Sequence, residues 1–254
     1  MIFDIVKIKS QVVDACRRLW ERNLVANHDG NITFRIDHDR FIATPTAFSK
    51  RDVTVDDLIV VSSDGKVLEG NQKVFSEVFQ HFAIYRARPE ITCVVHAHPP
   101  TASAFGIAKK DIGTPSIPEA VVSLGRSILT SQFFSPLDPL LKQIGSPFEV
   151  EMKRVLAESD GFVAPGNGAW TVGEEVIQTY LRMELLEHVA RQQILARELG
   201  NEMTLPNQLV DELVQKRPQR MSKLRSEINR ENSGLTREDI KNVVMSEITQ
   251  FLQD

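Results

Sequence analysis

Hydrophobic residues near the start of the chain recur at steps of three and four, with charged residues between them. This spacing predicts an amphipathic helix over residues 5–24. The hydrophobic residues with this spacing are Ile5, Ile8, Val12, Cys16, Leu19 and Trp20. The turn-forming run at residues 27–30 ends this helix, and shorter runs rich in Ile, Val, Thr and Phe then predict strands. These runs are residues 31–35, 40–44, 58–62 and 66–68.

The next part of the chain predicts two more helices and two buried strands. Ser76 can cap the first of these helices. The strand before Pro99 is too short and too β-branched for a helix, and Pro99 and Pro100 close it and can open a helix. The helices are expected over residues 76–87 and 173–199, and the strands over residues 91–98 and 161–165. Interspersed strands and helices indicate an α/β or α+β class.

The last quarter of the chain differs in character. We expect one domain over residues 1–200 and a charged helical extension over residues 201–254, because the latter has no Trp or Tyr and a single Phe. Residues 216–230 hold six basic residues and one acidic residue, which we interpret as a solvated helix face. The run at residues 235–252 is typical of an amphipathic helix.

Charge and composition exclude several classes of protein. The 254 residues include 30 basic and 34 acidic ones, a net charge of −4, which argues against binding to nucleic acid or to a membrane surface. No apolar run is long enough to span a bilayer, and no signal peptide is recognisable. Cys16 and Cys93 lie in apolar stretches, as buried cysteines of a reducing compartment do. We therefore expect a cytoplasmic protein.

The strongest chemical feature is His96-Ala97-His98 at the end of a predicted strand. On a strand, residues i and i+2 point to the same side roughly 6 to 7 Å apart, a span that two imidazoles can close on one metal ion. The alternative is a pair of surface histidines at a strand end. The apolar strand before them and the two prolines after them favour a buried, fixed site.

Glu77 lies at the start of the helix that precedes this strand. If the helix and the strand pack antiparallel, Glu77 returns close to His96 and His98. A metal ion beside a carboxylate suits proton abstraction next to a carbonyl, because the cation stabilises the enolate oxygen while the carboxylate takes the proton.

Several motifs resemble the class II aldolase/adducin family. Its core signature is similar to Phe-Ser-Glu at residues 75–77, residues 83–90, and the strand with both histidines at residues 94–100. Further matching segments are residues 30–35, 44–47, 117–119, 124–125 and 166–173, so that the resemblance spans roughly residues 8 to 198 in order.

The resemblance implies a fold and an activity. The fold is a three-layer α-β-α arrangement with a central, mostly antiparallel sheet, and the subunits of the family form homotetramers with active sites at their interfaces. The implied function is a divalent-metal-dependent lyase that acts on a small sugar phosphate or related ketose through an enediolate. The alternative is a non-catalytic binding or scaffold protein, as the adducins are.

The resemblance also implies residue roles. His96 and His98 match the ligands of a divalent metal ion, usually zinc, and Glu77 matches the acid/base glutamate. Epimerases of the family carry aspartate there, so a glutamate favours carbon–carbon cleavage or dehydration. The substrate phosphate would be bound by Gly30, Asn31, Thr46 and Ser76.

One departure concerns the metal site. Asn167 stands where the family has its third metal-binding histidine. An asparagine oxygen binds zinc more weakly than imidazole does and suits Mn or Mg better. We therefore expect Asn167 to be at most a weak ligand.

Other departures concern the substrate. Phe75 replaces a phosphate-binding serine and Ala47 replaces a glycine. The catalytic tyrosine that relatives lend to a neighbouring subunit falls near Phe133, and both tyrosines of the chain, Tyr85 and Tyr180, lie in other matched segments.

The remaining histidines are given structural interpretations. His81, four residues after Glu77 on the same helix face, could be a spare ligand, but a supporting or core role is favoured. His188 is interpreted as a helix-face residue, and His28 and His38 as solvated loop residues. The sequence leaves the substrate open.

Overall fold

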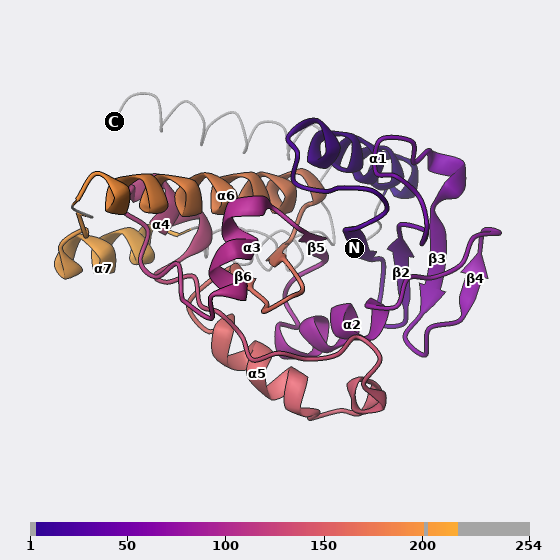
Figure 1. The fold of residues 1–254 in the computed structure, drawn as a ribbon. Helices are drawn as coiled ribbons and strands as arrows, with labels where there is room; N and C mark the ends of the chain where they lie inside the picture. Colours follow the sequence, from indigo (N-terminus) through magenta and orange to yellow (C-terminus); the bar gives the residue numbers. More distant parts are fainter. Residues whose placement is uncertain (1–3, 201–202, 218–254) are drawn as a thin grey trace, which may run out of the picture. The chain divides into compact units, whose positions relative to one another are not determined.

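The computed structural model describes residues 4–200 and 203–217 (Figure 1). The described residues up to Gln215 belong to one compact unit. Seven strands form a single sheet in the order β4-β3-β2-β1-β5-β7-β6, and every neighbouring pair is antiparallel. The strands are β1 (Asn31–Arg35), β2 (Arg40–Ala43), β3 (Ile59–Ser62), β4 (Val67–Glu69), β5 (Cys93–Ala97), β6 (Gly161–Val163) and β7 (Ala169–Gly173).

Helices cover both faces of this sheet (Figure 1). One face carries α1, α3, α4 and α6, and the other carries α2 and α5. The helices of the described residues are α1 (Ile5–Glu21), α2 (Val78–Ala87), α3 (Pro100–Ile107), α4 (Pro118–Leu124), α5 (Pro147–Val155), α6 (Val176–Glu198) and α7 (Asn207–Lys216), with short 3₁₀ turns η1 (Val55–Asp57) and η2 (Pro139–Lys142). The predicted three-layer α-β-α fold with an antiparallel sheet is confirmed.

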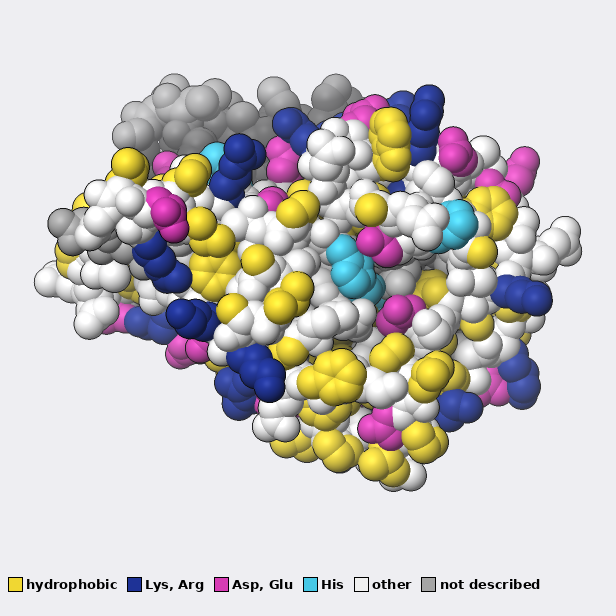
Figure 2. All heavy atoms as spheres, viewed as in Figure 1, with side chains coloured by type: hydrophobic (Ala, Val, Ile, Leu, Met, Phe, Trp, Pro, Cys, Tyr) yellow, Lys and Arg dark blue, Asp and Glu magenta, His cyan; other side chains and the backbone are white. Residues whose placement is uncertain are grey.

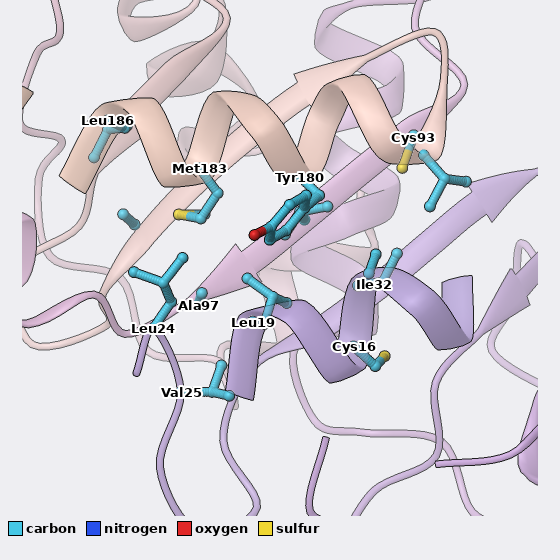
Figure 3. Close-up of a cluster of buried hydrophobic side chains, with 14 of the residues drawn as sticks. Cys16, Leu19, Leu24, Val25, Ile32, Cys93, Ala97, Tyr180, Met183 and Leu186 are labelled. Atoms are coloured by element: carbon cyan, nitrogen blue, oxygen red, sulfur yellow. The ribbon is translucent and has the colours of Figure 1, made fainter. Parts of the chain in front are cut away.

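The core under α1 and α6 is apolar. Figure 3 shows Leu19 of α1 and Tyr180 and Met183 of α6 directed toward the strand residues Ile32 and Ala97. All of them are buried, and burying a leucine-sized side chain stabilises the fold by roughly 1.5–3 kcal/mol. Both cysteines are buried and unpaired here as well. The hydrophobic spacing that predicted the first helix therefore marks the face it buries at Val12, Cys16 and Leu19, whereas Trp20 at its end is 39% exposed.

Strand β5 divides its side chains between the two faces. Val95 and Ala97 belong to the core under α1 and α6, whereas Val94 belongs to the core under α2 and α5. Side chains alternate along a strand, so His96 falls on the α2 side. The sheet thereby directs an imidazole away from the larger apolar core and toward α2.

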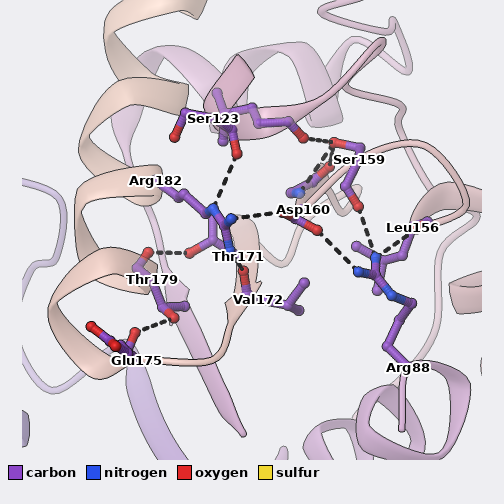
Figure 4. Close-up of polar contacts among 12 residues, drawn as sticks. Arg88, Ser123, Leu156, Ser159, Asp160, Thr171, Val172, Glu175, Thr179 and Arg182 are labelled. Atoms are coloured by element: carbon purple, nitrogen blue, oxygen red, sulfur yellow. Dashed lines mark hydrogen bonds and ion pairs between the residues drawn. The ribbon is translucent and has the colours of Figure 1, made fainter. Parts of the chain in front are cut away.

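A cluster of charged side chains joins Arg88, Asp160 and Arg182, which lie after α2, before β6 and within α6 (Figure 4). Asp160 lies between two arginines, 3.1 Å from Arg88 Nη2 and 2.9 Å from Arg182 Nη2. Arg182 Nη1 also donates to the Val172 carbonyl at 2.6 Å. Because losing one partner of a buried charge cluster is strongly destabilising, this cluster fixes the end of β7 against α6.

Two local predictions are wrong in detail. Ser76 does not cap α2: Glu77 occupies the N-cap position, and Ser76 Oγ donates to the Glu77 carboxylate at 2.9 Å. Residues 169–173 form strand β7 instead of leading into a helix at 173, and α6 begins at Val176. Strand β7 pairs with β5, more than seventy positions earlier, a partner that no local pattern reveals.

The extension is described only in part. Helix α7 lies within it, and Val210 of α7 packs against Val121 of α4. The helix predicted at residues 235–252 and most of the basic cluster at residues 216–230 lie outside the described residues. In the part of the chain that the structure describes, no helix is long and apolar enough to cross a membrane.

The turn between β6 and β7 gives a test of the fold. Gly168 has φ +63°, and a Cβ there would lie 2.1 Å from the Ala97 carbonyl oxygen. Gly168→Ala should therefore cost more than about 2 kcal/mol, since strand backbone cannot yield as a flexible side chain can. Gly145→Ala is the control, because Gly145 has φ +74° with nothing within 4 Å and should lose only about 1 kcal/mol. Equal losses in urea denaturation would contradict this prediction.

Candidate active site at the end of β5

The site is organised by three neighbouring strands. His96 of β5 pairs with Asn31 of β1 on one side and with Trp170 of β7 on the other. Residues in register across adjacent strands share a face of the sheet, so these three form one row beneath α2. The row lies at the end of β5, where the chain turns into α3.

The two histidines adopt the predicted arrangement. Their ring centroids are 4.9 Å apart, and the His96 ring stacks on Trp170 at 4.1 Å with an interplanar angle of 16°. His96 is buried and His98 is half-buried. The strand geometry therefore brings two imidazoles together at one point, with one of them fixed by the indole.

His96 has one free lone pair. Its Nε2 donates to the Asn167 backbone carbonyl at 3.0 Å, and its Nδ1 is buried with no hydrogen-bond partner among the described residues. Burial lowers the pKa of His96 well below its usual range, and nearby His98 and His81 lower it further. A neutral imidazole with an unpartnered nitrogen is a suitable donor for a divalent cation.

Asn167 does not offer its side chain to the histidines. Its Nδ2 group points to Gln80 Oε1 at 3.4 Å, while its backbone carbonyl accepts from His96. In residues 4–200 and 203–217, no three His, Cys, Asp or Glu side chains are grouped so as to hold a metal ion. The described residues bring the two imidazoles together, and their role as metal ligands stays a prediction.

Glu77 lies at the first turn of α2, half-buried. Helix α2 runs back along β5: Tyr85 near its end reaches the Thr92 carbonyl before β5, while His81 near its start contacts Trp170 beside His96. The antiparallel packing that the sequence suggested is therefore present. This packing places Glu77 toward the end of β5 where the histidine pair lies.

His81 is buried and uses both ring nitrogens. Nε2 donates to Asn31 Oδ1 at 2.5 Å, and Nδ1 lies 2.8 Å from Thr33 Oγ1, which in turn lies 2.9 Å from the Tyr85 hydroxyl. The His81 ring also packs edge-on against Phe75. His81 is thus a core residue that holds the Asn31 amide, as favoured over a ligand role.

The residues expected to bind phosphate lie on the loops around this row. A Cβ at Gly30 would lie 3.0 Å from the His96 carbonyl oxygen, so only glycine fits there. The Thr46 amide donates to the Lys73 carbonyl at 3.0 Å. Ser76 is exposed and Asn31 is buried against His81. Their role in binding stays a prediction.

Phe133 lies near the position where the sequence resemblance predicts a tyrosine of relatives. Phe133 is 67% exposed, and its ring lies beside Gly166 in the β6–β7 turn. Tyr85 bonds to the Thr33 carbonyl, and Tyr180 bonds to Glu184. Both hydroxyls are engaged away from the histidine pair.

Sequence reasoning missed three residues of this region. Trp170 stacks on His96, Gln80 holds the Asn167 amide, and Lys50 is buried although it lies in a run of charged residues. Trp170 lies in the matched segment 166–173 without having been given a role, and neither periodicity nor a motif marked Gln80 or Lys50. A buried lysine within a polar loop has no local signature, because its burial is produced by the loops packed over it.

His81 predicts a pH dependence of stability. Burial lowers its pKa from 6.5 to about 3, so the unfolded chain binds a proton that the folded protein excludes. The contribution of His81 to the free energy of unfolding is constant above pH 6.5. Below that, the free energy of unfolding should fall by roughly 1.4 kcal/mol per pH unit between about pH 6 and pH 4. Urea denaturation of wild type and His81→Gln, with His38→Gln as control, measures it. An equally steep fall in all three proteins would contradict the prediction.

Comparison with known proteins places the chain in a family. Residues 10–194 match the family model described as "Class II Aldolase and Adducin N-terminal domain". An L-fuculose phosphate aldolase of Methanococcus maripaludis is 26% identical over 182 residues, which cover 72% of this chain and 93% of the relative. The L-ribulose-5-phosphate 4-epimerase UlaF of Salmonella paratyphi B is 27% identical over 205 residues, covering 76% and 87%.

A solved structure supports the same fold. An L-fuculose 1-phosphate aldolase superposes with a TM-score of 0.72 at 18% identity, covering 83% of this chain and 95% of the other. The prediction of an enzyme is confirmed at the level of the family, since these relatives are enzymes that act on sugar phosphates. The match over residues 10–194, more than half of the sequence, shows that the chain belongs to the class II aldolase and adducin family.

Proposed function

We propose that the protein is a divalent-metal-dependent lyase that cleaves a carbon–carbon bond of a small phosphorylated ketose. The observation that carries the proposal is the His96–His98 pair at the end of β5, with an unpartnered buried nitrogen on His96. The names of the relatives, an aldolase and a 4-epimerase of sugar phosphates, support the substrate class. The glutamate at position 77 favours cleavage over epimerisation.

His96 and His98 would hold the cation, since both present imidazoles at one strand end. A bound divalent cation supplies a Lewis acid for the carbonyl oxygen of the substrate. Zinc is the metal that the family resemblance implies. The Asn167 side chain points to Gln80, so the chain offers two imidazoles, whereas zinc is best held by three. Mn or Mg is therefore the alternative metal.

Glu77 would move the proton. When a ketose is cleaved between the carbons α and β to its carbonyl, the β-hydroxyl gives up its proton and its carbon leaves as the aldehyde. The electron pair of the broken bond passes toward the carbonyl oxygen, and the α-carbon then takes a proton. A carboxyl group at the start of α2, near the end of β5 that carries the histidines, can exchange that proton. The hydrogen bond from Ser76 Oγ orients the Glu77 carboxylate. The phosphate would bind at Gly30, Asn31, Thr46 and Ser76.

A homo-oligomer, a tetramer by family resemblance, is part of this proposal. Exposed hydrophobic side chains follow one another between α4 and α5, including Phe133, Leu137 at 79% and Ile144 at 86% exposed. Figure 2 shows hydrophobic side chains gathered along the lower edge of this face, where Figure 1 places α5. Apolar surface of this kind is typical of subunit contacts. A second copy could then complete the site, which lacks a tyrosine at Phe133.

A non-catalytic binding protein is the second candidate. The orientation of the Asn167 amide away from His96 favours it, because loss of a third ligand is how a metal site degenerates. The cytoplasmic location expected from the sequence fits either candidate.

Carbon–carbon cleavage tests the leading proposal. Glu77→Gln should lower turnover of a panel of ketose 1-phosphates by about 100-fold or more, since the amide cannot exchange the proton. Aldehyde release is measured, with L-ribulose 5-phosphate included to detect epimerisation. Glu69→Gln is the control, because Glu69 is exposed on β4. Turnover by wild type that is unchanged in Glu77→Gln would contradict the role of Glu77.

Metal content separates the two candidates. Protein purified without chelator should contain a divalent metal that is lost in His96→Ala, and Asn167→His should raise zinc affinity by roughly tenfold or more by adding a third imidazole. Elemental analysis and zinc titration measure both, with His188→Ala as control. Metal-free wild type without affinity for zinc, manganese or magnesium would favour the binding protein.

A further inference from the structure

Lys50 is the buried cation nearest to the loops expected to bind phosphate. It lies between β2 and η1 and is only 1% exposed. Its Nζ donates to the Phe48 carbonyl at 3.0 Å and to the His28 carbonyl at 3.4 Å. Unlike most buried charged groups, it forms no ion pair within the described residues. A lysine in such surroundings calls for a reason, because burying an unpaired ammonium is costly.

The two carbonyls that bind Lys50 belong to the two phosphate loops. His28 lies two residues before Gly30, and Phe48 lies two residues after Thr46. The chain between Thr46 and Phe48 has an unusual backbone, since Ala47 has φ +61°, a value that glycine adopts more readily. The ammonium therefore fastens two segments that are far apart along the sequence and are both placed at the site.

Fastening alone does not require a charge. A neutral glutamine could donate two hydrogen bonds to the same carbonyls without the cost of desolvating an ammonium group. Burial lowers the pKa of Lys50 below its usual range, and nearby Cys16, Asp29 and Glu77 offset this only in part. The presence of a lysine here favours a function of the positive charge itself.

The proposed substrate supplies such a function. Gly30, Asn31, Thr46 and Ser76 are all uncharged, whereas a phosphate monoester carries a charge near −2 at neutral pH. Figure 2 shows the exposed Lys and Arg side chains mainly toward the periphery of the pictured face. A fixed cation beneath the loops would act strongly on the anion, because a buried charge is poorly screened.

We propose that Lys50 is a positioning residue that joins the Gly30 and Thr46 loops and supplies the positive charge for a substrate phosphate bound on them. This inference rests on the proposed function only in its choice of ligand. Neither the sequence motifs nor the comparisons point to this residue. In this role, Lys50 affects the affinity for an anion without having to contact the anion directly.

Inorganic phosphate is the probe, titrated calorimetrically into the full-length protein. Lys50→Gln keeps hydrogen-bond donors and removes the charge, and should weaken phosphate binding by roughly tenfold or more. Lys50→Arg keeps the charge and should stay within a few-fold of wild type. Lys66→Gln is the control, because Lys66 is exposed and paired with Asp64. Circular dichroism checks that each variant is folded, and Lys50→Arg still tests the charge if Lys50→Gln unfolds.

The outcomes separate this inference from the proposed function. Equal phosphate affinity in wild type and folded Lys50→Gln, no phosphate binding by wild type, or loss of binding in folded Lys50→Arg would overturn the role of Lys50. In the turnover assay, Lys50→Gln should raise KM for a phosphorylated ketose more than it lowers kcat. Phosphate binding that depends on Lys50, together with no turnover of any ketose phosphate, would overturn the proposed lyase and leave the anion site intact.

Discussion

The pairing of β5 with β1 and β7 is the constraint on which the site depends. Because β5 has a hydrogen-bonded neighbour on each side, its end cannot shift without breaking two ladders. That fixed end carries His96, and the same pairing sets Asn31 and Trp170 beside it. The alternation of side chains along the strand directs His96 toward α2, and His98, one residue beyond the strand, has its ring 4.9 Å from the His96 ring. Preorganised ligands of this kind lose little entropy when they bind.

Polar groups buried around this strand are matched to one another with few exceptions. His81 satisfies both ring nitrogens through Asn31 and Thr33, and stays neutral. The exceptions are informative, because leaving a buried polar atom unpaired costs about 1–3 kcal/mol. One of them is the Nδ1 atom of His96. The ammonium of Lys50 differs, because it has carbonyl partners but no ion pair within the described residues. These are the two groups to which we assign a metal ion and a phosphate in our proposals.

Phe75 and Asn167, the two departures from the expected family pattern, both contact other residues of the site region. Phe75, which the resemblance aligns with a phosphate-binding serine, packs on the His81 ring. Asn167 contributes its backbone carbonyl to His96 and its amide to Gln80. The β6–β7 turn is thus tied into the site without its side chain serving as a ligand. The chain therefore has the family fold, while the side chains at positions 75 and 167 make contacts within the protein.

The sequence by itself determined the elements whose signals are local. Hydrophobic spacing identified α1, the β-branched run identified β5, and the spacing of His96 and His98 along that strand determined that they face the same way. Tertiary structure decided what depends on partners far along the chain. Strand β7 exists because β5 supplies its hydrogen bonds, and Ser76 is not a cap because Glu77 takes that position. Lys50 is buried and its ammonium reaches the His28 carbonyl 22 positions earlier, and no pattern of neighbouring residues encodes a contact of that range.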